Sequence, residues 1–333
     1  MIADSFVKTA SIELETPGTR AHLPETPGRM LADSAFKWIT RIMSIAVILL
    51  IFLVACELYK PSRLALREFG WKFIISSEWD PVTEHFGALP FIYGTVVSSL
   101  IALIIAVPLS IGTALYLTEM APRWLQTPLI FLIELLSAIP SVILGLWGIF
   151  VMVPWFREQM FPALKTAFGF LPIFKGPIYG VSFLAGGIII AIMILPIITS
   201  LSREIILAVP KLQREAAYAL GATRWEVTRV AVLSHAKKGI FGAIILGLGR
   251  ALGETMAVTM VIGNRPEIAT SLFAPGYTLA SVVANEFAEA TTDLYLSALF
   301  EVGLVLLVIT IIVNIFAQLL LRAFSNSSSH FRS

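Results

Sequence analysis

Two charged residues stand inside an apolar stretch of this sequence. Arg250 and Glu254 lie four residues apart within the apolar segment 239–263, so they would share one face of a continuous helix. An arginine near the middle of a membrane helix costs at least about 2.5 to 3.5 kcal/mol to insert unless it is solvated or paired. A guanidinium keeps its charge and binds two oxygens of an oxyanion at once. The pair therefore indicates either an anion-binding site or mutual neutralisation of two charges at a helix interface.

Glu254 suggests which anion such a site would prefer. A carboxylate accepts a hydrogen bond from the hydroxyl of monohydrogen phosphate, whereas sulfate has no hydroxyl to donate. We therefore expect a site formed by Arg250 and Glu254 to favour phosphate over sulfate. The remaining polar groups in apolar segments are more typical of hydrogen bonds between helices than of transport ligands. They are Glu134, Glu301 and the pair Asn314 and Gln318.

The composition places these charges in a membrane protein. Of the 333 residues, 57% are hydrophobic and 14% are charged, which leaves too little polar surface to cover a soluble globule. The net charge of +2 gives no support for nucleic-acid binding. The single cysteine, Cys56, excludes an intramolecular disulfide, and the four histidines show no metal-ligand spacing. We expect neither redox nor zinc chemistry.

Apolar segments long enough to cross a bilayer predict an all-α membrane protein with six transmembrane helices. The expected spans are 38–58, 92–117, 128–153, 178–201, 239–263 and 294–321. Polar and helix-breaking residues are expected to interrupt the third span at Ser137, Pro140, Ser141 and Gly145. For the first span, a cleaved lipoprotein signal ending at Cys56 is an alternative with an unusually long basic region before it.

Charge and composition outside the spans predict the orientation and the remaining segments. The loop 202–238 carries seven Lys and Arg against three Glu, so we expect it, and the amino terminus, to be cytoplasmic. The segment 264–293 has one basic residue, Arg265, and is expected outside. The other expected segments are a mobile cytoplasmic tail at 1–37, an external subdomain at 59–91, a helical core at 92–322 and a second cytoplasmic tail at 323–333.

The stretch 210–238 is too polar to span and predicts two short helices that meet at Gly221. Ala216 and Ala217 would permit close approach of a partner, Glu215 would pair with a basic group, and Gly221 would make the bend. This Glu-Ala-Ala and Gly pattern resembles the cytoplasmic coupling loop of binding-protein-dependent ATP-binding-cassette (ABC) importers. An ordinary amphipathic connector is the alternative. No Gly-Lys dipeptide occurs, so a Walker A loop ending in Gly-Lys-Ser/Thr is absent from the sequence.

A narrower resemblance covers residues from about 73 to 321. This region resembles the C-type permeases of the bacterial phosphate-specific transport (Pst) importers, a family of type I ABC transporter transmembrane proteins. The blocks that carry the resemblance are 77–81, 86–95, 139–141, 215–217, 249–258, 262–264 and 284–290. The blocks 249–258, around Arg250 and Glu254, and 284–290, with Asn-Glu-Phe, are the most specific of them.

The resemblance implies a type I permease fold with a coupling helix between the fourth and fifth spans, in the bacterial cytoplasmic (inner) membrane. It implies a transport subunit and not an enzyme, with a second permease subunit, two copies of a cytoplasmic ATPase that hold ATP and Mg²⁺, and an external phosphate-binding protein as partners. Arg250 and Glu254 would line the substrate pathway. Alternatives are a permease for sulfate or molybdate and a secondary transporter whose protons move on Glu134, Glu254 and Glu301. An additional signalling role stays open.

Overall fold

The computed structural model describes residues 27–326, with side chains from 34 to 322, and this part of the chain is mostly helical. Six of the described helical segments are long and apolar enough to cross a membrane, as the sequence predicts. Contacts divide the chain into two units, one that ends at Val54 and one that begins at Ala55. The predicted tails lie largely at 1–26 and 327–333, outside the described residues.

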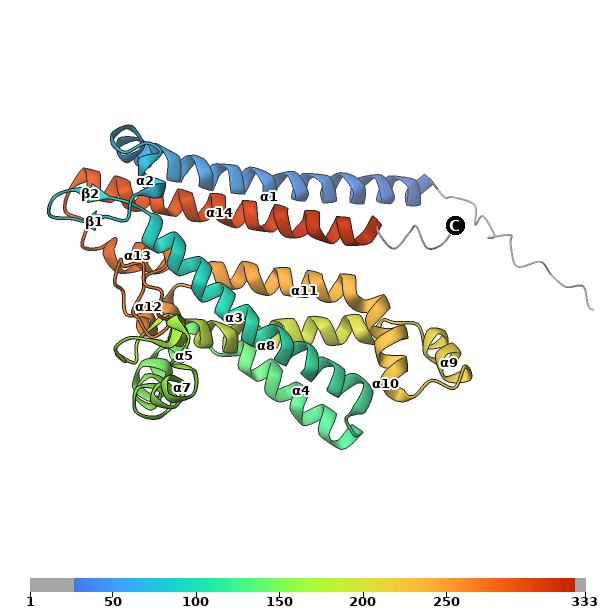
Figure 1. Ribbon diagram of the computed structural model, residues 1–333. Coiled ribbons are helices and arrows are strands. Elements are labelled where there is room, and N and C mark those ends of the chain that lie inside the picture. Colours follow the sequence, from blue (N-terminus) through green and yellow to red (C-terminus); the bar gives the residue numbers. More distant parts are fainter. Residues whose placement is uncertain (1–26, 327–333) are drawn as a thin grey trace, which may run out of the picture. The chain divides into compact units, whose positions relative to one another are not determined.

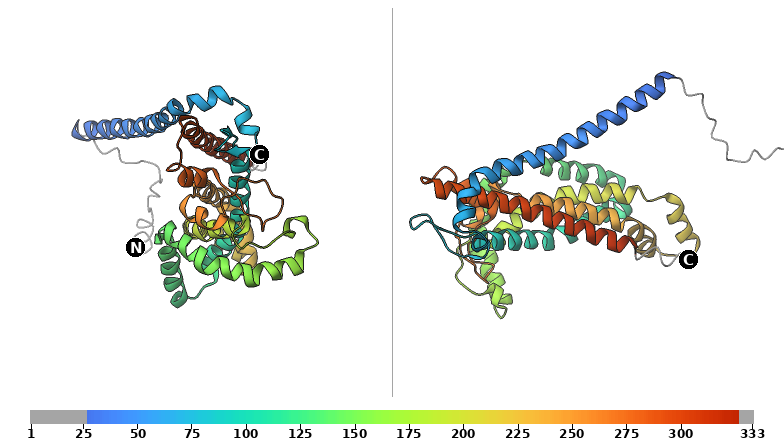
Figure 2. Two further views of the ribbon diagram at one scale, coloured as in Figure 1. Left: turned by 90° about the vertical axis from the view of Figure 1, so that its left-hand side faces the viewer. Right: turned by 90° about the horizontal axis from the view of Figure 1, so that it is seen from above.

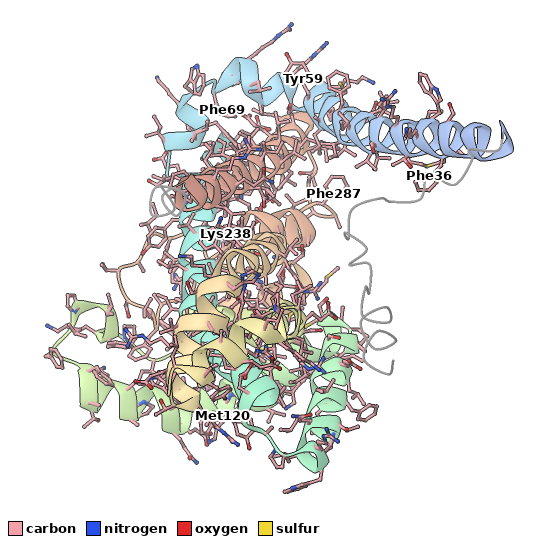
Figure 3. All side chains as sticks on the ribbon, turned by 90° about the vertical axis from the view of Figure 1, so that its right-hand side faces the viewer. Phe36, Tyr59, Phe69, Met120, Lys238 and Phe287 are labelled. Carbon is pink, nitrogen blue, oxygen red and sulfur yellow. The ribbon has the colours of Figure 1, made fainter. Side chains whose placement is uncertain are left out.

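The first unit contains the amino-terminal part of helix α1 (Pro27–Glu68). Every residue from 34 to 54 is exposed, and the most apolar window of this helix has a mean hydropathy of 2.6. Figure 3 shows its side chains, among them Phe36, standing out from the ribbon. A continuous helix with apolar side chains on all sides is what a bilayer requires of a spanning segment, because every backbone hydrogen bond closes within the helix.

Helix α1 runs ten residues beyond the predicted end of the first span, from 58 to Glu68. The polar residues after Leu58 end the apolar run, but most of them are good helix formers, so the helix itself continues. It stops at Gly70, whose φ of +50° is a left-handed conformation that favours glycine, with the Gly70 amide bonded to the Leu66 carbonyl. The first part of the predicted external subdomain is therefore a helical extension.

The core of the second unit is formed by α3 (Leu89–Leu115), α8 (Phe183–Leu207) and α11 (Ser234–Leu252), which pack against one another in Figure 1. Glycines lie at the closest approaches. A Cβ at Gly247 of α11 would lie 2.7 Å from Cδ1 of Ile198 in α8, and one at Gly239 would lie 2.6 Å from Cγ2 of Ile205. Small residues let helix backbones approach closely, which gains dispersion energy that burial in lipid alone does not supply.

The third predicted span is broken, as its proline predicts. Helix α4 (Arg123–Ala138) ends before Pro140 and α5 (Ser141–Trp147) begins after it, because proline lacks an N–H and disfavours helical backbone in the residue before it. The helical path then continues to Phe168, 15 residues beyond the predicted end, through α6 (Val153–Trp155), α7 (Phe161–Phe168) and two π-helical turns.

Aromatic residues pack together at one end of the second unit. The short helix α2 (Lys72–Ile75) leads into a hairpin of β1 (Trp79–Asp80) and β2 (His85–Phe86), in which Trp79 pairs with Phe86. The Trp79 ring contacts Phe86 and Phe91 edge-on, at centroid distances of 4.9 and 4.7 Å. Hydrogen bonds from Thr83, and from the Val82 amide, hold the pKa of the Asp80 carboxyl below its usual range and close the turn.

Glu286 joins this hairpin to the carboxyl-terminal helices. It is the last residue of α13 (Leu279–Glu286), and its Oε2 accepts a hydrogen bond from Trp79 Nε1 at 2.8 Å and another from Tyr295 Oη at 2.7 Å. Tyr295 lies in the first turn of α14 (Asp293–Asn326). We call Trp79, Phe86, Phe91, Glu286 and Tyr295 the aromatic cap. Three sequence blocks that are separated along the chain, 77–81, 86–95 and 284–290, meet in it.

The polar helix α9 (Lys211–Ala219) lies at the other end of the second unit, followed by α10 (Arg224–Glu226). Figure 1 and the right view of Figure 2 place the β1–β2 hairpin and α9 at opposite ends of the helices α3, α8 and α11. The spanning helices therefore separate two polar ends.

We predict that Gly94→Ala destabilises the protein, because a Cβ at Gly94 in α3 would overlap the Tyr277 carbonyl oxygen. Overpacking of this kind costs about 1 to 3 kcal/mol. Gly112→Ala in the same helix is the matched control: a Cβ there meets nothing within 4 Å, and replacing a helical glycine by alanine gains about 0.5 to 1 kcal/mol. Thermal melting in detergent measures both. Equal melting of the two variants would contradict the packing of α3 against Tyr277.

Candidate functional site

The fifth predicted span is not one helix, and its break lies between the two charged residues. Helix α11 ends at Leu252, and α12 (Met256–Ile262) begins after a bend formed by Gly253, Glu254 and Thr255. Arg250 is exposed in the last turn of α11, whereas Glu254 is 9% exposed and lies in the bend. The prediction that the two residues share one helix face is therefore wrong, because glycine and a local Thr255 hydroxyl bond to the Gly253 carbonyl end the helix between them.

The alternative of mutual neutralisation is not what the structure shows. Within the described residues, the ion pairs join other side chains, and Arg250 has neither an ion pair nor a hydrogen bond. Glu254 is engaged differently: its Oε1 accepts a long hydrogen bond of 3.5 Å from the amide of Ala257, in the first turn of α12. The carbonyls that end α11 favour a cation at Arg250, and the amides that begin α12 favour the carboxylate.

The surface beside Arg250 is open. A Cβ at Gly249 would meet nothing within 4 Å, and one at Gly253 would meet only the Gly249 carbonyl, at 3.8 Å. An unpaired guanidinium on an open face of an apolar helix needs water, a counter-charge or a ligand to offset its cost. The geometry thus leaves Arg250 free to bind an anion, with a carboxylate nearby in sequence and held by the bend.

Three other polar side chains in apolar helices have no hydrogen bond to a neighbouring helix within the described residues. Glu301 in α14 is 2% exposed, and its Oε2 has no hydrogen-bond partner; it borders a largely apolar cavity of about 690 Å³. Asn314 donates to the carbonyl of Thr310 within its own helix, at 2.8 Å. Glu134 in α4 is exposed, and no side-chain hydrogen bond or ion pair is found for it in the described part of the chain. Within the described residues, none of these three side chains forms a hydrogen bond to a neighbouring helix.

The polar loop forms the predicted pair of helices meeting at Gly221. Gly221 has a φ of +82°, its amide donates to the Tyr218 carbonyl at 2.9 Å, and the Ala222 amide donates to the Ala217 carbonyl at 3.2 Å. These bonds end α9 in the manner of a glycine cap. The next helical segment starts with a capping box in which Thr223 and Glu226 bond each other's backbone amides. The Thr-x-x-Glu spacing was the sequence signal for this start.

Helix α9 buries none of its residues. Leu212, Ala216 and Leu220 recur every four residues and are all exposed, with Leu212 at 77% and Leu220 at 89%. Glu215 is exposed beside them, and Ala217 is half-buried. An apolar stripe on a polar, solvent-facing helix is a surface suited to a protein partner.

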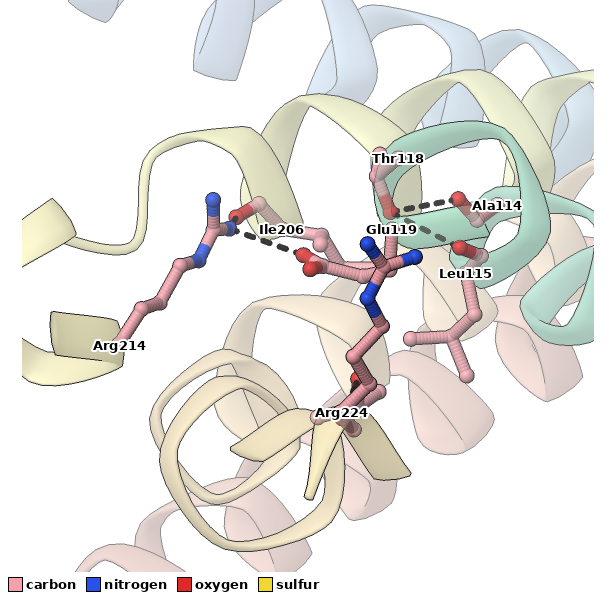
Figure 4. A network of polar contacts seen from close by, with 8 residues as sticks. Ala114, Leu115, Thr118, Glu119, Ile206, Arg214 and Arg224 are labelled. Atoms are coloured by element: carbon pink, nitrogen blue, oxygen red, sulfur yellow. Dashed lines mark hydrogen bonds and ion pairs between the residues drawn. The ribbon is translucent and has the colours of Figure 1, made fainter. Parts of the chain in front are cut away.

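An ion pair that was not predicted from the sequence anchors α9 to the spanning helices. Arg214 of α9 lies 3.1 Å from Glu119, which sits in the π-helical turn at the end of α3, and its Nη2 also donates to the Ile206 carbonyl of α8 at 2.8 Å (Figure 4). Both side chains are mostly buried, at 22% and 16% exposed. In Figure 4 the Arg224 side chain rises from α10 toward the same carboxylate. Two sequence features could have indicated this pair: Glu119 ends an apolar run, and Arg214 directly precedes Glu-Ala-Ala.

The broken spanning helices, the open face at Arg250 and the exposed helix pair define a polytopic membrane permease. The chain belongs to the family of binding-protein-dependent transport system inner membrane components, whose pattern it matches over residues 106–326. Among solved structures, it is similar to a chain of a bacterial ABC transporter involved in the import of the acidic polysaccharide alginate. That similarity covers 89% of this chain and 99% of the other, with a TM-score of 0.54 at 15% identity, and it supports the fold alone.

Curated relatives match over nearly the whole length. A phosphate transport system permease protein PstC of Mesorhizobium japonicum is 46% identical over 317 residues, which cover 94% of this chain and 97% of the relative. A protein of the same name from Haemophilus influenzae is 45% identical, with 87% and 93% covered. The type I permease fold expected from the sequence is confirmed.

We predict that Glu119→Gln loosens α9. Breaking a mostly buried ion pair leaves an uncompensated guanidinium, so local opening of α9 becomes easier by at least about 1.4 kcal/mol, or tenfold. Amide hydrogen exchange of residues 211–219 measures this. Lys211→Gln, on an exposed residue of the same helix, is the control and should change exchange little. Unchanged protection of α9 in Glu119→Gln would show that Arg214 is held by the Ile206 carbonyl alone.

Proposed function

We propose that this chain is the permease subunit of an ATP-driven importer of inorganic phosphate. The observation that carries the proposal is the unpaired, exposed Arg250 beside the bend that holds Glu254, in a chain whose relatives are named phosphate transport permeases. An open cationic group in an apolar span is costly, and binding of an oxyanion offsets that cost. The permease itself catalyses no reaction in this proposal.

In this proposal, Arg250 and Glu254 divide the recognition of phosphate between them. The guanidinium binds two phosphate oxygens through paired N–H groups, a geometry that any tetrahedral oxyanion satisfies. The Glu254 carboxylate accepts the P–OH hydrogen and repels an oxyanion that has no proton to donate. In a continuous helix, a spacing of four would favour an ion pair between the guanidinium and the carboxylate. The bend at Gly253–Thr255 instead allows both groups to face one ligand without pairing with each other.

We assign the exposed surface of α9 to a cytoplasmic ATPase, of which two copies would act with this chain and a second permease subunit. Leu212, Ala216 and Leu220 offer an apolar contact, Ala217 permits close approach, and Glu215 offers a charge to a basic group. ATP and Mg²⁺ belong to the ATPase. The excess of basic residues in 202–238 supports a cytoplasmic position for this loop and for the amino terminus, in the bacterial cytoplasmic (inner) membrane.

Transport then follows an alternating-access cycle. An external phosphate-binding protein delivers the anion to the end of the permease that carries the aromatic cap, and closure of the ATPase pair moves α9. The Arg214–Glu119 pair passes that movement to α3 and, through the Ile206 carbonyl, to α8. A permease for sulfate or molybdate differs from this proposal in anion preference, and a secondary transporter differs in needing no ATPase.

We predict that Arg250→Ala lowers uptake of labelled phosphate by about tenfold to a hundredfold. This range corresponds to loss of hydrogen bonds to a charged group, worth about 1.5 to 3 kcal/mol. The assay uses cells that lack their own high-affinity importer and that supply the partner subunits, at matched membrane abundance. Arg157→Ala, at an exposed arginine of a π-helical turn, is the control and should transport normally.

Anion competition completes this experiment. Excess sulfate should not reduce uptake by the unaltered protein and should reduce it in Glu254→Gln, because the amide no longer repels sulfate. Uptake that survives Arg250→Ala would remove the arginine from the pathway. Uptake by this chain without any ATPase, driven by an ion gradient, would favour the secondary transporter.

We predict that Gly221→Val abolishes co-purification of the ATPase. A β-branched residue is strained at the φ of +82°, although no atom lies within 4 Å of the added Cβ, so the change acts on the backbone and not on packing. Gly221→Asn is the matched control, because asparagine tolerates left-handed backbone better, and it should keep the ATPase. If both variants retain the ATPase, α9 is not its docking surface.

A further inference from the structure

A second set of polar groups lies between α4 and α8, away from Arg250. A cavity of about 270 Å³ is bordered by Glu134 and Ser137 from α4 and by Ser200 from α8. A narrow recess beside it is bordered by Glu134, Ser200, Thr199 and Arg203. Hydroxyl groups, one guanidinium and one carboxylate thus meet between two largely apolar helices.

Arg203 and Glu134 do not form an ion pair with each other. Arg203 is half-buried, Glu134 is exposed, and neither takes part in an ion pair or a side-chain hydrogen bond within residues 34–322. Thr199 is 1% exposed, and its Oγ1 has no hydrogen-bond partner. Native structures rarely leave a buried hydroxyl unsatisfied, and a guanidinium and a carboxylate that border one recess without pairing are both open to a ligand, so their occurrence together fits the binding of a polar anion.

We propose that this place binds a protonated tetrahedral oxyanion, monohydrogen phosphate, as a second station for the transported anion. Arg203 binds the unprotonated oxygens, Ser200 and Thr199 donate their hydroxyl hydrogens, and Glu134 accepts the P–OH hydrogen. Ser137 donates to the Glu134 carbonyl at 2.7 Å, so its oxygen offers only lone pairs to the ligand. The cavity of about 270 Å³ has room for phosphate, whereas the recess that Arg203 and Thr199 border holds about 10 Å³. The anion therefore sits in the cavity, and Arg203 and Thr199 reach it from the recess.

The station lies farther along the spanning helices than Arg250. Gly247 of α11 faces Ile198 of α8, and Gly239 faces Ile205, so the two helices run antiparallel in register. Arg250 lies three residues beyond Gly247 toward the carboxyl end of α11, and Arg203 lies five residues beyond Ile198 toward the carboxyl end of α8. Because the two helices are antiparallel, these displacements point in opposite directions. The two arginines are therefore about 12 Å apart along the axis, at 1.5 Å per residue. Arg203 is on the side of the coupling loop. This inference rests on the proposed function, since it concerns the same anion.

Thiol labelling tests binding at the station directly. In the assembled complex, Cys56→Ser removes the single cysteine, and Ile197→Cys places a reporter on the cavity wall. Inorganic phosphate should slow reaction with a small charged thiol reagent at least threefold, and sulfate should slow it less. Arg203→Ala should abolish protection, Arg203→Lys should retain part of it, and Glu134→Gln should let sulfate protect as well as phosphate. Leu201→Cys, on the same wall, serves if Ile197→Cys does not react.

Labelling that is indifferent to phosphate at both reporter positions, in a complex that takes up phosphate, would overturn the second station and leave the proposed function intact. Failure of the unaltered complex to take up phosphate would instead overturn the proposed function, and protection by phosphate would then still establish a binding site. Protection that survives Arg203→Ala assigns the anion to another group and also overturns the inference.

Discussion

In a bilayer, every backbone N–H and C=O must find its partner within the protein, and this constraint explains where polar chemistry occurs in the chain. Unbroken helices satisfy it by themselves, so an interruption is tolerated only where other groups replace the lost bonds. At the bend between α11 and α12, the Thr255 hydroxyl and the Glu254 carboxylate bond to nearby backbone groups. At Pro140, the missing N–H is the cause of the break. Each interruption therefore offers polar groups in a place where the surrounding sequence is apolar.

Helix α3 connects the two polar ends of the second unit. At one end Phe91 packs against Trp79 of the aromatic cap, and Thr95 Oγ1 accepts the Leu279 amide at 2.9 Å. At the other end the π-helical turn places Glu119 next to Arg214 of α9. A packed helix with a specific contact at each end is a physical route for coupling between the two ends. The route depends on one mostly buried ion pair, which explains why α9 can be positioned although it has no fully buried residue.

Local rules predicted the features that depend on local physics. Hydropathy found the apolar spans, proline placed the break at Pro140, and glycine at position 221 predicted a bend that the structure realises with a left-handed φ. The relation of Arg250 to Glu254 was missed because spacing of four assumes a continuous helix, and Gly253 ends it. The Arg214–Glu119 pair joins residues 95 positions apart, so no periodicity reveals it. Helix α1 extends beyond its apolar run because helix propensity and hydropathy are separate properties.

Transport requires binding that is strong enough to recruit the anion and weak enough to release it, and sequential sites satisfy both demands better than one deep site. The charges of the second unit fit that requirement. Arg250 and Arg203 are each accompanied by a glutamate, and neither arginine forms an ion pair with it in the described structure. A closed ion pair would be cheaper to bury but would have to be broken for each anion. When the arginine and glutamate stay unpaired, the folded protein bears the free-energy cost of the unpaired charges. An arriving anion then binds the arginine without first breaking an ion pair, and repulsion by the glutamate limits its affinity.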